Sequence, residues 1–396
     1  MIMLISYKST VRACYVGIIC LAIVANLTAL LFTVLGEQFG LSFTQLGALV
    51  MVYFIVQVAV ALIFGPIVDR IGFRPFIVGA HILAAVGMAW FAATPVSPLE
   101  PYVMMMIGSF IFGIAGGFLE LLVSPILNAV PTDEKSSAMS IMHSFYCFGH
   151  VAVVFGTTLF LAVFGRESWQ IIFLLWLLVP LANAIAYARC PIAEATPVES
   201  QSTARDAFKK PLLFILIAMI AFGAASELTV ASWASAFMEE AMGLPKVAGD
   251  IIGIGTFAIA MGIGRLTYGI LKQKDTKWLP QQSHLMVMGS GMAFVSYIFL
   301  ATTHSPFLGF LACVICGLGV SLLWPGALSL AVEAFPKAGT WIFAILTVGG
   351  TFGASAGPSV FGVIADAEGL RTAFMIMAAV PLLSLAAGLL YHKIKI

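Results

Sequence analysis

The sequence predicts an all-α membrane protein, with twelve transmembrane helices arranged in two pseudo-symmetric six-helix bundles. Of the 396 residues, 61% are hydrophobic and 9% are charged, whereas soluble domains carry about 25% charged residues. The apolar residues gather in runs of about 20, the length of helix that crosses a bilayer. Backbone polar groups must be satisfied within lipid, so these runs are expected to be helical. The predicted spans are residues 12–36, 43–68, 75–94, 101–128, 137–164, 168–188, 211–238, 247–271, 282–302, 305–330, 338–364 and 370–391.

The positive charges predict how these spans are oriented. With both termini on the cytoplasmic side, all but three of the 19 lysines and arginines fall on that side. The three on the outer side are Arg166, Lys246 and Arg371. Lys and Arg accumulate in cytoplasmic loops, so the sequence predicts a multi-pass protein of the plasma (inner) membrane with cytoplasmic N- and C-termini. One helix more or fewer would scramble this bias, which supports the count of twelve.

The two halves of the chain echo each other. Asn26-Leu27-Thr28-Ala29 in the first span is matched by Glu227-Leu228-Thr229-Val230 in the seventh, and further short matches keep nearly the same offset. The sequence therefore predicts an N-terminal bundle (residues 1–188), a cytoplasmic linker (189–210) and a C-terminal bundle (211–396). In transporters built from such repeats, the solute binds between the halves near the bilayer midplane.

A charged ten-residue stretch, Gly65 to Arg74, joins the second and third spans. So short a hairpin must turn tightly, which suits Gly65 and Gly72, because glycine adopts backbone angles that other residues resist. Asp69, Arg70 and Arg74 are too costly to place in lipid, so we expect them to pair at the water boundary.

This stretch fits the pattern G-x-x-x-D-R-x-G-x-R and resembles the loop between the second and third helices of the major facilitator superfamily. In that family the loop braces the cytoplasmic side of the transporter when the outside is open. The resemblance implies a gate made of Gly65, Asp69, Arg70, Gly72 and Arg74. A topological anchor of positive charge is the alternative.

Two acidic residues fall deep within spans: Glu120 in the fourth and Glu227 in the seventh. A carboxylate in the bilayer core normally faces a cavity, a partner or a proton path. Burial disfavours its charged form, so each can take up a proton, and we predict that both couple transport to protons. A buried salt bridge is the alternative. It is weakened because no Lys or Arg is expected at comparable depth, with Arg265 expected to extend to the inner surface.

Three segments resemble the fucose–proton symporter family within that superfamily. Glu120 is followed by Ser124-Pro125, which is similar to an E-x-x-x-N-P element, and residues 142–150 are similar to Q-S-F-N-x-x-G. Ala225-Ser226-Glu227, followed by Trp233, resembles a G-x-E element. The resemblance implies that Glu120 takes part in proton coupling and sugar binding. The first span carries Asn26 where that family has an acid. Coupling could therefore rest on Glu120 and Glu227, or the chain could be a relative with different coupling or direction.

A sugar site needs polar side chains for the hydroxyls and an aromatic plate, usually Trp, for the apolar ring faces. The predicted binding residues are Asn26, Thr28, Gln57, Glu120, His143, Tyr146, Glu227, Trp233 and Trp324. The repeat offset places Trp324 opposite Glu120, while packing is the alternative for either Trp. His143 and His150 lie in the fifth span. Because histidine titrates near neutrality, a proton relay through one of them is a hypothesis beside a core role.

Absent motifs narrow the class of function. The chain has no P-loop, so ATP drive is not expected, and neither an enzyme activity nor a cofactor or metal is predicted. Cys313 and Cys316 form a CxxC inside an apolar run, for which packing is favoured over a metal or redox site. A net charge of +1 does not suggest a nucleic-acid partner.

The predicted function is secondary active transport by alternating access, carried out by a monomer in the lipid bilayer. The expected solute is a monosaccharide or similar small polar molecule, moved in symport with protons or with sodium. Two alternatives are kept: a proton-driven efflux transporter for amphipathic compounds or metabolites, and a membrane sensor that does not transport.

Overall fold

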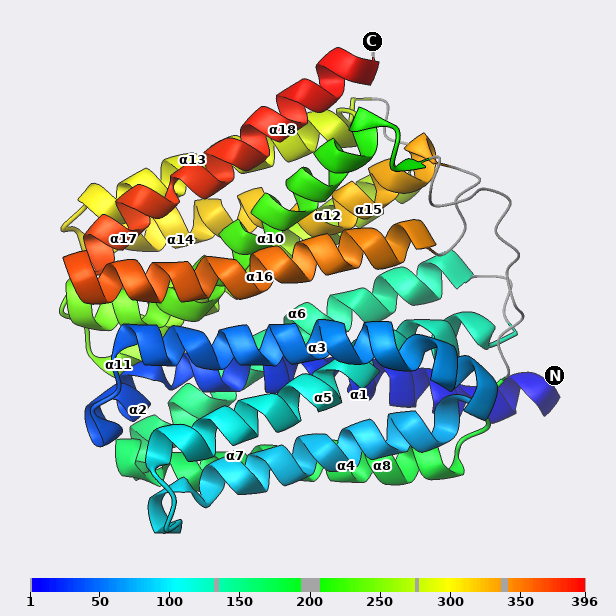
Figure 1. Cartoon of the computed structure of the whole chain (residues 1–396), viewed down its shortest axis with the longest axis horizontal. Helices are drawn as coiled ribbons and strands as arrows, with labels where there is room; N and C mark the ends of the chain where they lie inside the picture. The colour runs from blue at the N-terminus through cyan, green and yellow to red at the C-terminus, as the bar shows by residue number, and fades with distance from the viewer. Residues whose placement is uncertain (1, 132–134, 194–206, 275–277, 336–340, 396) are drawn as a thin grey trace. The chain divides into compact units, whose positions relative to one another are not determined.

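The computed structural model describes residues 2–131, 135–193, 207–274, 278–335 and 341–395. This part of the chain is almost entirely helical and contains no β-strand (Figure 1). Twelve of its stretches are long and apolar enough to cross a membrane, which confirms the predicted fold class. The α-helices are α1 (Ile2–Leu30), α2 (Phe32–Phe39), α3 (Phe43–Ile71), α4 (Phe73–Ala92), α5 (Pro101–Ala129), α6 (Lys135–Phe164), α7 (Trp169–Trp176), α8 (Leu178–Arg189), α10 (Pro211–Ala236), α11 (Lys246–Asp250), α12 (Thr256–Gln273), α13 (Gln282–Thr302), α14 (Pro306–Val320), α15 (Leu323–Ala334), α16 (Trp341–Glu368), α17 (Leu370–Met377) and α18 (Ala379–Lys395).

Several spans are built from consecutive helical pieces rather than from one helix. The sixth combines a 3₁₀ turn, η2 (Arg166–Ser168), with α7 and α8. The seventh and eighth each contain a π-helical turn, η3 (Phe237–Ala241) and η4 (Ile251–Gly255). A further 3₁₀ turn, η1 (Thr94–Val96), follows α4.

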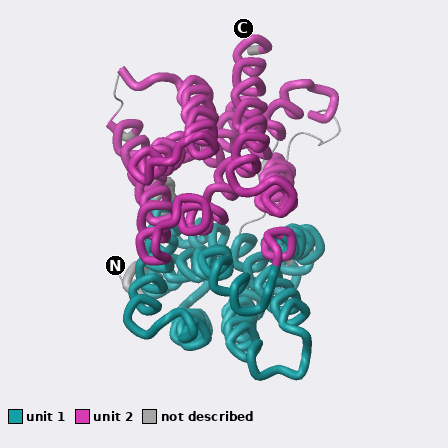
Figure 2. Tube along the Cα trace, turned by 90° about the vertical axis from the view of Figure 1, so that its left-hand side faces the viewer, with its two compact units in different colours: residues 1–41, 48–196 teal, residues 42–47, 197–396 magenta. Residues whose placement is uncertain are grey.

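The chain divides into two compact units (Figure 2). Unit 1 comprises residues 1–41 and 48–196, and unit 2 comprises residues 42–47 and 197–396. The change from one unit to the other at residues 196 and 197 falls inside the predicted linker 189–210. The short segment 42–47, which the sequence analysis assigned to the N-terminal bundle, groups with unit 2.

The contacts of residues 42–47 explain that grouping. The carboxylate of Asp366, near the end of α16, accepts hydrogen bonds from the backbone N–H groups of Phe43 (2.8 Å) and Thr44 (2.6 Å). These are two of the N–H groups that the first turn of a helix leaves without an intrahelical acceptor. Ser42 and Gln45 satisfy a third, because the Ser42 hydroxyl accepts from the Gln45 N–H while the Gln45 side chain accepts from the Ser42 N–H.

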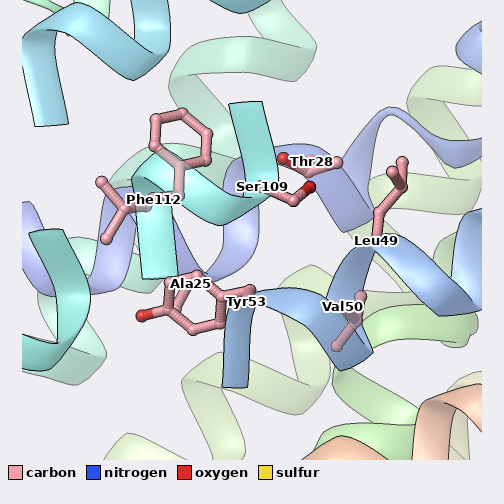
Figure 3. Close-up of a pocket in the computed structure, with 8 residues that line it drawn as sticks. Ala25, Thr28, Leu49, Val50, Tyr53, Ser109 and Phe112 are labelled. Atoms are coloured by element: carbon pink, nitrogen blue, oxygen red, sulfur yellow. The ribbon is translucent and has the colours of Figure 1, made fainter. Parts of the chain in front are cut away.

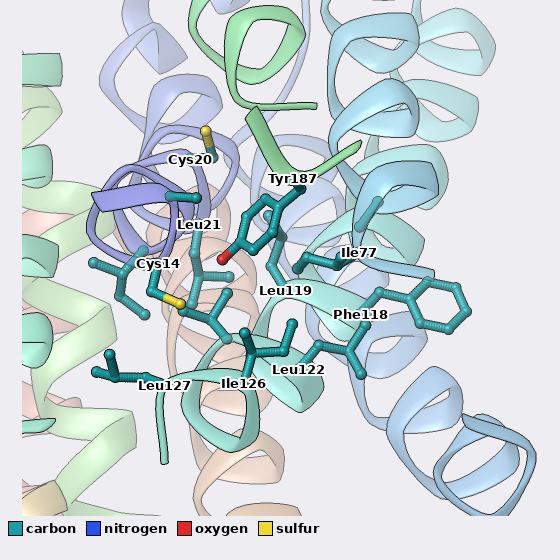
Figure 4. Close-up of a cluster of buried hydrophobic side chains, with 14 of the residues drawn as sticks. Cys14, Cys20, Leu21, Ile77, Phe118, Leu119, Leu122, Ile126, Leu127 and Tyr187 are labelled. Carbon is teal, nitrogen blue, oxygen red and sulfur yellow. The ribbon is translucent and has the colours of Figure 1, made fainter. Parts of the chain in front are cut away.

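The core of unit 1 is formed by buried side chains of α1, α3, α4, α5, α6 and α8 (Figure 4). Small and medium side chains of α5, including Leu119 and Leu122, pack against Cys14 and Cys20 of α1 and against the ring of Tyr187 from α8. All of these side chains are at most 1% exposed. The core is thus apolar even though Tyr187 lies in it.

The hairpin between α3 and α4 turns at one residue. Helix α3 continues without a break through Gly65 to Ile71, and α4 begins at Phe73. Gly72 alone makes the turn, with a φ of 94° that favours glycine. The expectation that Gly65 also forms the turn is therefore wrong, since Gly65 lies within the helix.

In unit 2, α10 and α16 pack so closely that side chains are excluded between them. A Cβ atom on Gly357 would lie 2.7 Å from the carbonyl oxygen of Ala225, and one on Gly353 would overlap the backbone of Ala221. Small residues permit this kind of approach between membrane helices. The close packing fixes the part of α10 that carries Glu227.

Candidate functional site

Unit 1 contains a cluster of polar side chains contributed by α1, α3, α5 and α6. Asn26 of α1 is 3% exposed, and its side-chain amide donates to the carbonyl of Ala22 (2.8 Å) and to the hydroxyl of Tyr146 (3.3 Å). The second bond ties α1 to α6. Two of the predicted binding residues are therefore brought together.

Glu120, on α5, belongs to the same cluster. Its side chain is partly exposed, and its carboxylate makes no hydrogen bond or ion pair with another residue that the structure describes. Glu120 and Tyr146 both act electrostatically on the hydroxyl of Tyr53, so the three groups are neighbours. The cluster thus holds an acid that no described Lys or Arg neutralises.

Tyr53 and Gln57 complete the cluster from α3. They are 4% and 8% exposed, and neither the Tyr53 hydroxyl nor the Gln57 side-chain carbonyl finds a hydrogen-bond partner within the described chain. Gln57 is among the predicted binding residues, whereas Tyr53 is not. The spacing in the sequence could have identified Tyr53, because it precedes Gln57 by four positions and such residues lie on the same face of a helix.

A small pocket adjoins the cluster in unit 1. It is lined by α1, α3 and α5, with the hydroxyl-bearing residues Thr28, Ser109 and Tyr53 among its walls (Figure 3). In Figure 3 the ring of Tyr53 borders the pocket, while its hydroxyl is directed away from Thr28 and Ser109. Tyr53 therefore has its ring at the pocket and its hydroxyl at the Glu120 side.

The two histidines of α6 differ in their surroundings. His143 is exposed, whereas His150 is 1% exposed. Both make further interactions. A proton relay through either stays a prediction.

Unit 2 contains a buried ion pair between Glu227 of α10 and Arg265 of α12. The Arg265 Nη2 lies 3.1 Å from Oε1 and 3.3 Å from Oε2 of Glu227, and Nε donates to the carbonyl of Ser321 (3.0 Å). The side chains are 20% and 10% exposed for Arg265 and Glu227 respectively. The expectation that Arg265 extends to the inner surface is wrong, and so is the premise that no cation reaches the depth of Glu227.

The backbone beside Glu227 is also held by a hydrogen bond. The hydroxyl of Tyr297, a fully buried residue of α13, donates to the carbonyl of Ser226 (2.8 Å). The ion pair on one side and this bond on the other connect α10 to two neighbouring helices. Glu227 is thus a structural element of unit 2, whatever else it does.

The two predicted tryptophans lie in unit 2 and are packed. Trp233 is 0% exposed, donates to the carbonyl of Pro358 (2.9 Å), stacks on Phe361 and meets Phe43 edge-on. Its ring is not available to a sugar in this structure, which corrects the expectation of a stacking plate. Trp324 is partly exposed, and its ring packs against Gly350, where a Cβ would approach it to 2.5 Å.

Of the predicted gate residues, Arg74 has the most defined contacts. Its guanidinium donates to three backbone carbonyls at the end of α8: Tyr187 (2.9 Å), Ala188 (2.8 Å) and Cys190 (2.8 Å). Helix C-termini leave such carbonyls without intrahelical donors, and a cation suits them. Arg70 is exposed, and the side chain of Asp69 lies outside the described residues. The predicted pairing of Asp69 stays a prediction.

A second buried ion pair lies near the π-helical turns of unit 2. Lys246 Nζ is 2.6 Å from Asp250 Oδ1 and 3.0 Å from the hydroxyl of Ser235, which also bonds to Asp250. Lys246 and Asp250 are 6% and 0% exposed. The outer-side charge that the sequence analysis assigned to Lys246 is therefore neutralised inside the fold.

These features together define a class: a polytopic helical membrane protein in two units, each with ionisable groups inside its membrane-spanning part. A family comparison agrees, since residues 14–341 match the model of the Major Facilitator Superfamily. The chain belongs to the major facilitator superfamily. It is accordingly a multi-pass membrane protein and a secondary transporter rather than an enzyme.

Comparisons with individual proteins support the same fold. A stretch of 118 residues is 30% identical to the uncharacterized MFS-type transporter YttB of Bacillus subtilis (strain 168), and it spans 30% of each protein. Crystal structures of a bacterial homolog to the human lysosomal transporter Spinster are similar throughout. The inward-facing, occupied form has a TM-score of 0.79 at 15% identity, and the unoccupied form 0.76 at 16%. Both comparisons cover 98% of this chain and 97% of the other. At these identities the likeness extends to the fold.

Proposed function

We propose that the protein is a proton-coupled symporter that moves a monosaccharide or related polyol inward, with Glu120 as the proton-binding group. One observation carries the assignment: Glu120 lies among polar side chains without a described cationic partner, whereas Glu227 is paired with Arg265. A carboxylate in a membrane interior is stabilised either by a cation or by taking up a proton. The unpaired acid is therefore the one that changes its protonation during transport.

The neighbours of Glu120 support solute binding at the same place. A protonated carboxyl donates one hydrogen bond and accepts others, as a sugar hydroxyl does. Asn26, Gln57 and Tyr146 supply further donors and acceptors on α1, α3 and α6. Solute binding would favour protonated Glu120, and loss of the proton on the cytoplasmic side would weaken binding and release both. The resemblance of residues 120–125 to the fucose–proton symporters favours the same role.

The Glu227–Arg265 pair is proposed to assist indirectly. Protonation of Glu227 would cost its attraction to Arg265, so this acid holds α10 against α12 in one state of the cycle. The predicted gate around Arg74 and the inner-membrane location with cytoplasmic termini belong to the same proposal.

The test measures external pH in a lightly buffered suspension of energy-depleted cells that express the protein, after addition of aldoses and polyols one at a time. We expect one solute to make the medium more alkaline in wild type and not in Glu120→Gln. Counterflow exchange of that solute should persist in part. Glu368→Gln, an exposed carboxylate at the end of α16, is the matched control and should behave as wild type.

Equal alkalinisation in Glu120→Gln would contradict the proton assignment. If no aldose or polyol changed the external pH, and cells exported dye only when they expressed this protein, the efflux alternative would be favoured instead.

A further inference from the structure

The hydroxyl of Tyr53 and the side-chain carbonyl of Gln57 are buried polar groups whose hydrogen-bonding capacity the described fold does not use. Tyr53 is 4% exposed and Gln57 8% exposed, and these two atoms have no partner in the described chain. Buried polar atoms in native proteins are nearly always paired, so each exception needs an explanation. Because the two atoms lie one helical turn apart, a single ligand could bind both.

The packing of α3 on α5 brings the Tyr53 hydroxyl close to Glu120 and the Gln57 turn of α3 alongside the same part of α5. A Cβ on Gly116 would lie 2.5 Å from the Tyr53 hydroxyl, and one on Gly117 would lie 2.9 Å from the backbone carbonyl of Gln57. The glycines therefore let the Tyr53–Gln57 face of α3 approach the backbone of α5. Glu120 follows Gly116 by four residues, so it lies on the same face of α5 one turn further along.

The hydrogen-bonding chemistry of Tyr53, Gln57 and Glu120 indicates which class of ligand they can bind. An amide and a phenol can each donate and accept a hydrogen bond, and so can a protonated carboxyl. A ligand hydroxyl matches this because it also donates and accepts. An ammonium group can only donate and would leave the Gln57 NH₂ unmatched. An anion would be repelled whenever Glu120 is ionised.

We propose that Tyr53 and Gln57 form a specificity subsite that binds hydroxyl groups of the transported solute beside Glu120. This deepens the proposed function and rests on it. The subsite requires a neutral, polyhydroxylated solute, and it makes Tyr53 a determinant of which hydroxyl positions are recognised. A site that hydrogen-bonds a ligand hydroxyl rejects the analogue without that hydroxyl, because its own polar groups are then left unpaired.

The test is calorimetric titration of the purified protein at fixed pH. Aldohexoses, aldopentoses and hexitols are tested first, followed by the monodeoxy analogues of each binder. Tyr53→Phe should bind the parent solute about tenfold more weakly, the loss expected for one hydrogen bond. One deoxy analogue should show the same loss in wild type and no further loss in Tyr53→Phe. Tyr102→Phe, a partly exposed tyrosine at the start of α5, should leave every affinity unchanged.

The outcomes separate this inference from the proposed function. Binding that Tyr53→Phe does not weaken overturns the subsite, while proton coupling through Glu120 can still hold. No binding across the panel overturns the solute class and with it both proposals.

Thermal unfolding gives a second readout. Because the Tyr53 hydroxyl has no described protein partner, Tyr53→Phe should unfold at or above the wild-type temperature. A clear decrease would mean that the hydroxyl stabilises the fold, and it would overturn the assignment.

Discussion

The same substitution should change the stability of the protein at one of the two intramembrane glutamates and not at the other. Glu120→Gln and Glu227→Gln each replace a carboxylate with an amide of nearly the same shape. Glu227 has Arg265 at 3.1 Å, whereas no described residue pairs with the carboxylate of Glu120. The first substitution should therefore leave stability almost unchanged, while the second leaves a buried guanidinium without its counter-charge.

The expected magnitude follows from the geometry of the pair. Removing one partner of a buried ion pair costs about 3–5 kcal/mol. Arg265 is 20% exposed, so water can solvate part of its charge, and the lower figure of about 3 kcal/mol is appropriate. For a unit of roughly 150–250 residues, each kcal/mol lowers Tm by about 2–4 °C. Glu227→Gln should therefore unfold about 6–12 °C below wild type.

A thiol-reactive dye provides the assay, because all six cysteines are buried thiols in the folded protein. Dye labelling during heating reports when the fold opens. The double variant Glu227→Gln/Arg265→Gln should recover most of the lost Tm, since it removes the orphaned charge together with its partner. A Glu227→Gln variant as stable as wild type, or a Glu120→Gln variant equally destabilised, would refute the reasoning.

Three further substitutions test local contacts, each by dye-monitored unfolding against a conservative control. Asp366→Ala should cost about 1–2 kcal/mol because two N–H groups of α3 lose their acceptor, and Asp366→Asn should cost less. Arg74→Ala should lower Tm by several degrees through the loss of three bonds to the end of α8, and Arg74→Lys should restore only part of this because Lys lacks the planar fork. Gly116→Ala should cost about 1–3 kcal/mol and weaken solute binding, because its methyl group would collide with the Tyr53 hydroxyl; unchanged stability and binding would contradict the close approach of α3 and α5.

The sequence was sufficient to predict the fold class because the bilayer acts as a uniform constraint. A run of about 20 apolar residues has few alternatives to a membrane-spanning helix. The number of spans could therefore be predicted without knowing which helices contact one another. The breaks within spans could not be predicted from the sequence. The π-helical turns η3 and η4 arise from packing, and an apolar run shows no sequence pattern that marks them. The hairpin at Gly72 was expected, but the extension of α3 through Gly65 was not.

The site was harder to predict because it depends on which helix faces meet. Arg265 was expected at the surface since position along a span does not reveal that α12 turns this residue toward Glu227. Trp233 looked like a sugar plate in the sequence, yet the close approach of α16 buries it against Phe361. Tyr53 was missed because a single tyrosine in an apolar helix is unremarkable until α5 brings Glu120 beside it.

The internal repeat explains why Glu227 and Glu120 differ in their bonding to neighbouring helices. Asn26 and Glu227 occupy matching positions in the first long helix of each half, and each makes a polar bond to another helix of its own unit, to Tyr146 and Arg265 respectively. The repeated position therefore connects helices in both halves, by an amide in one and an ion pair in the other. An acid that is bound to a permanent cation gains little from taking up a proton. Glu120 has no counterpart in this repeated connection, so a change in its protonation would break no bond that the structure describes.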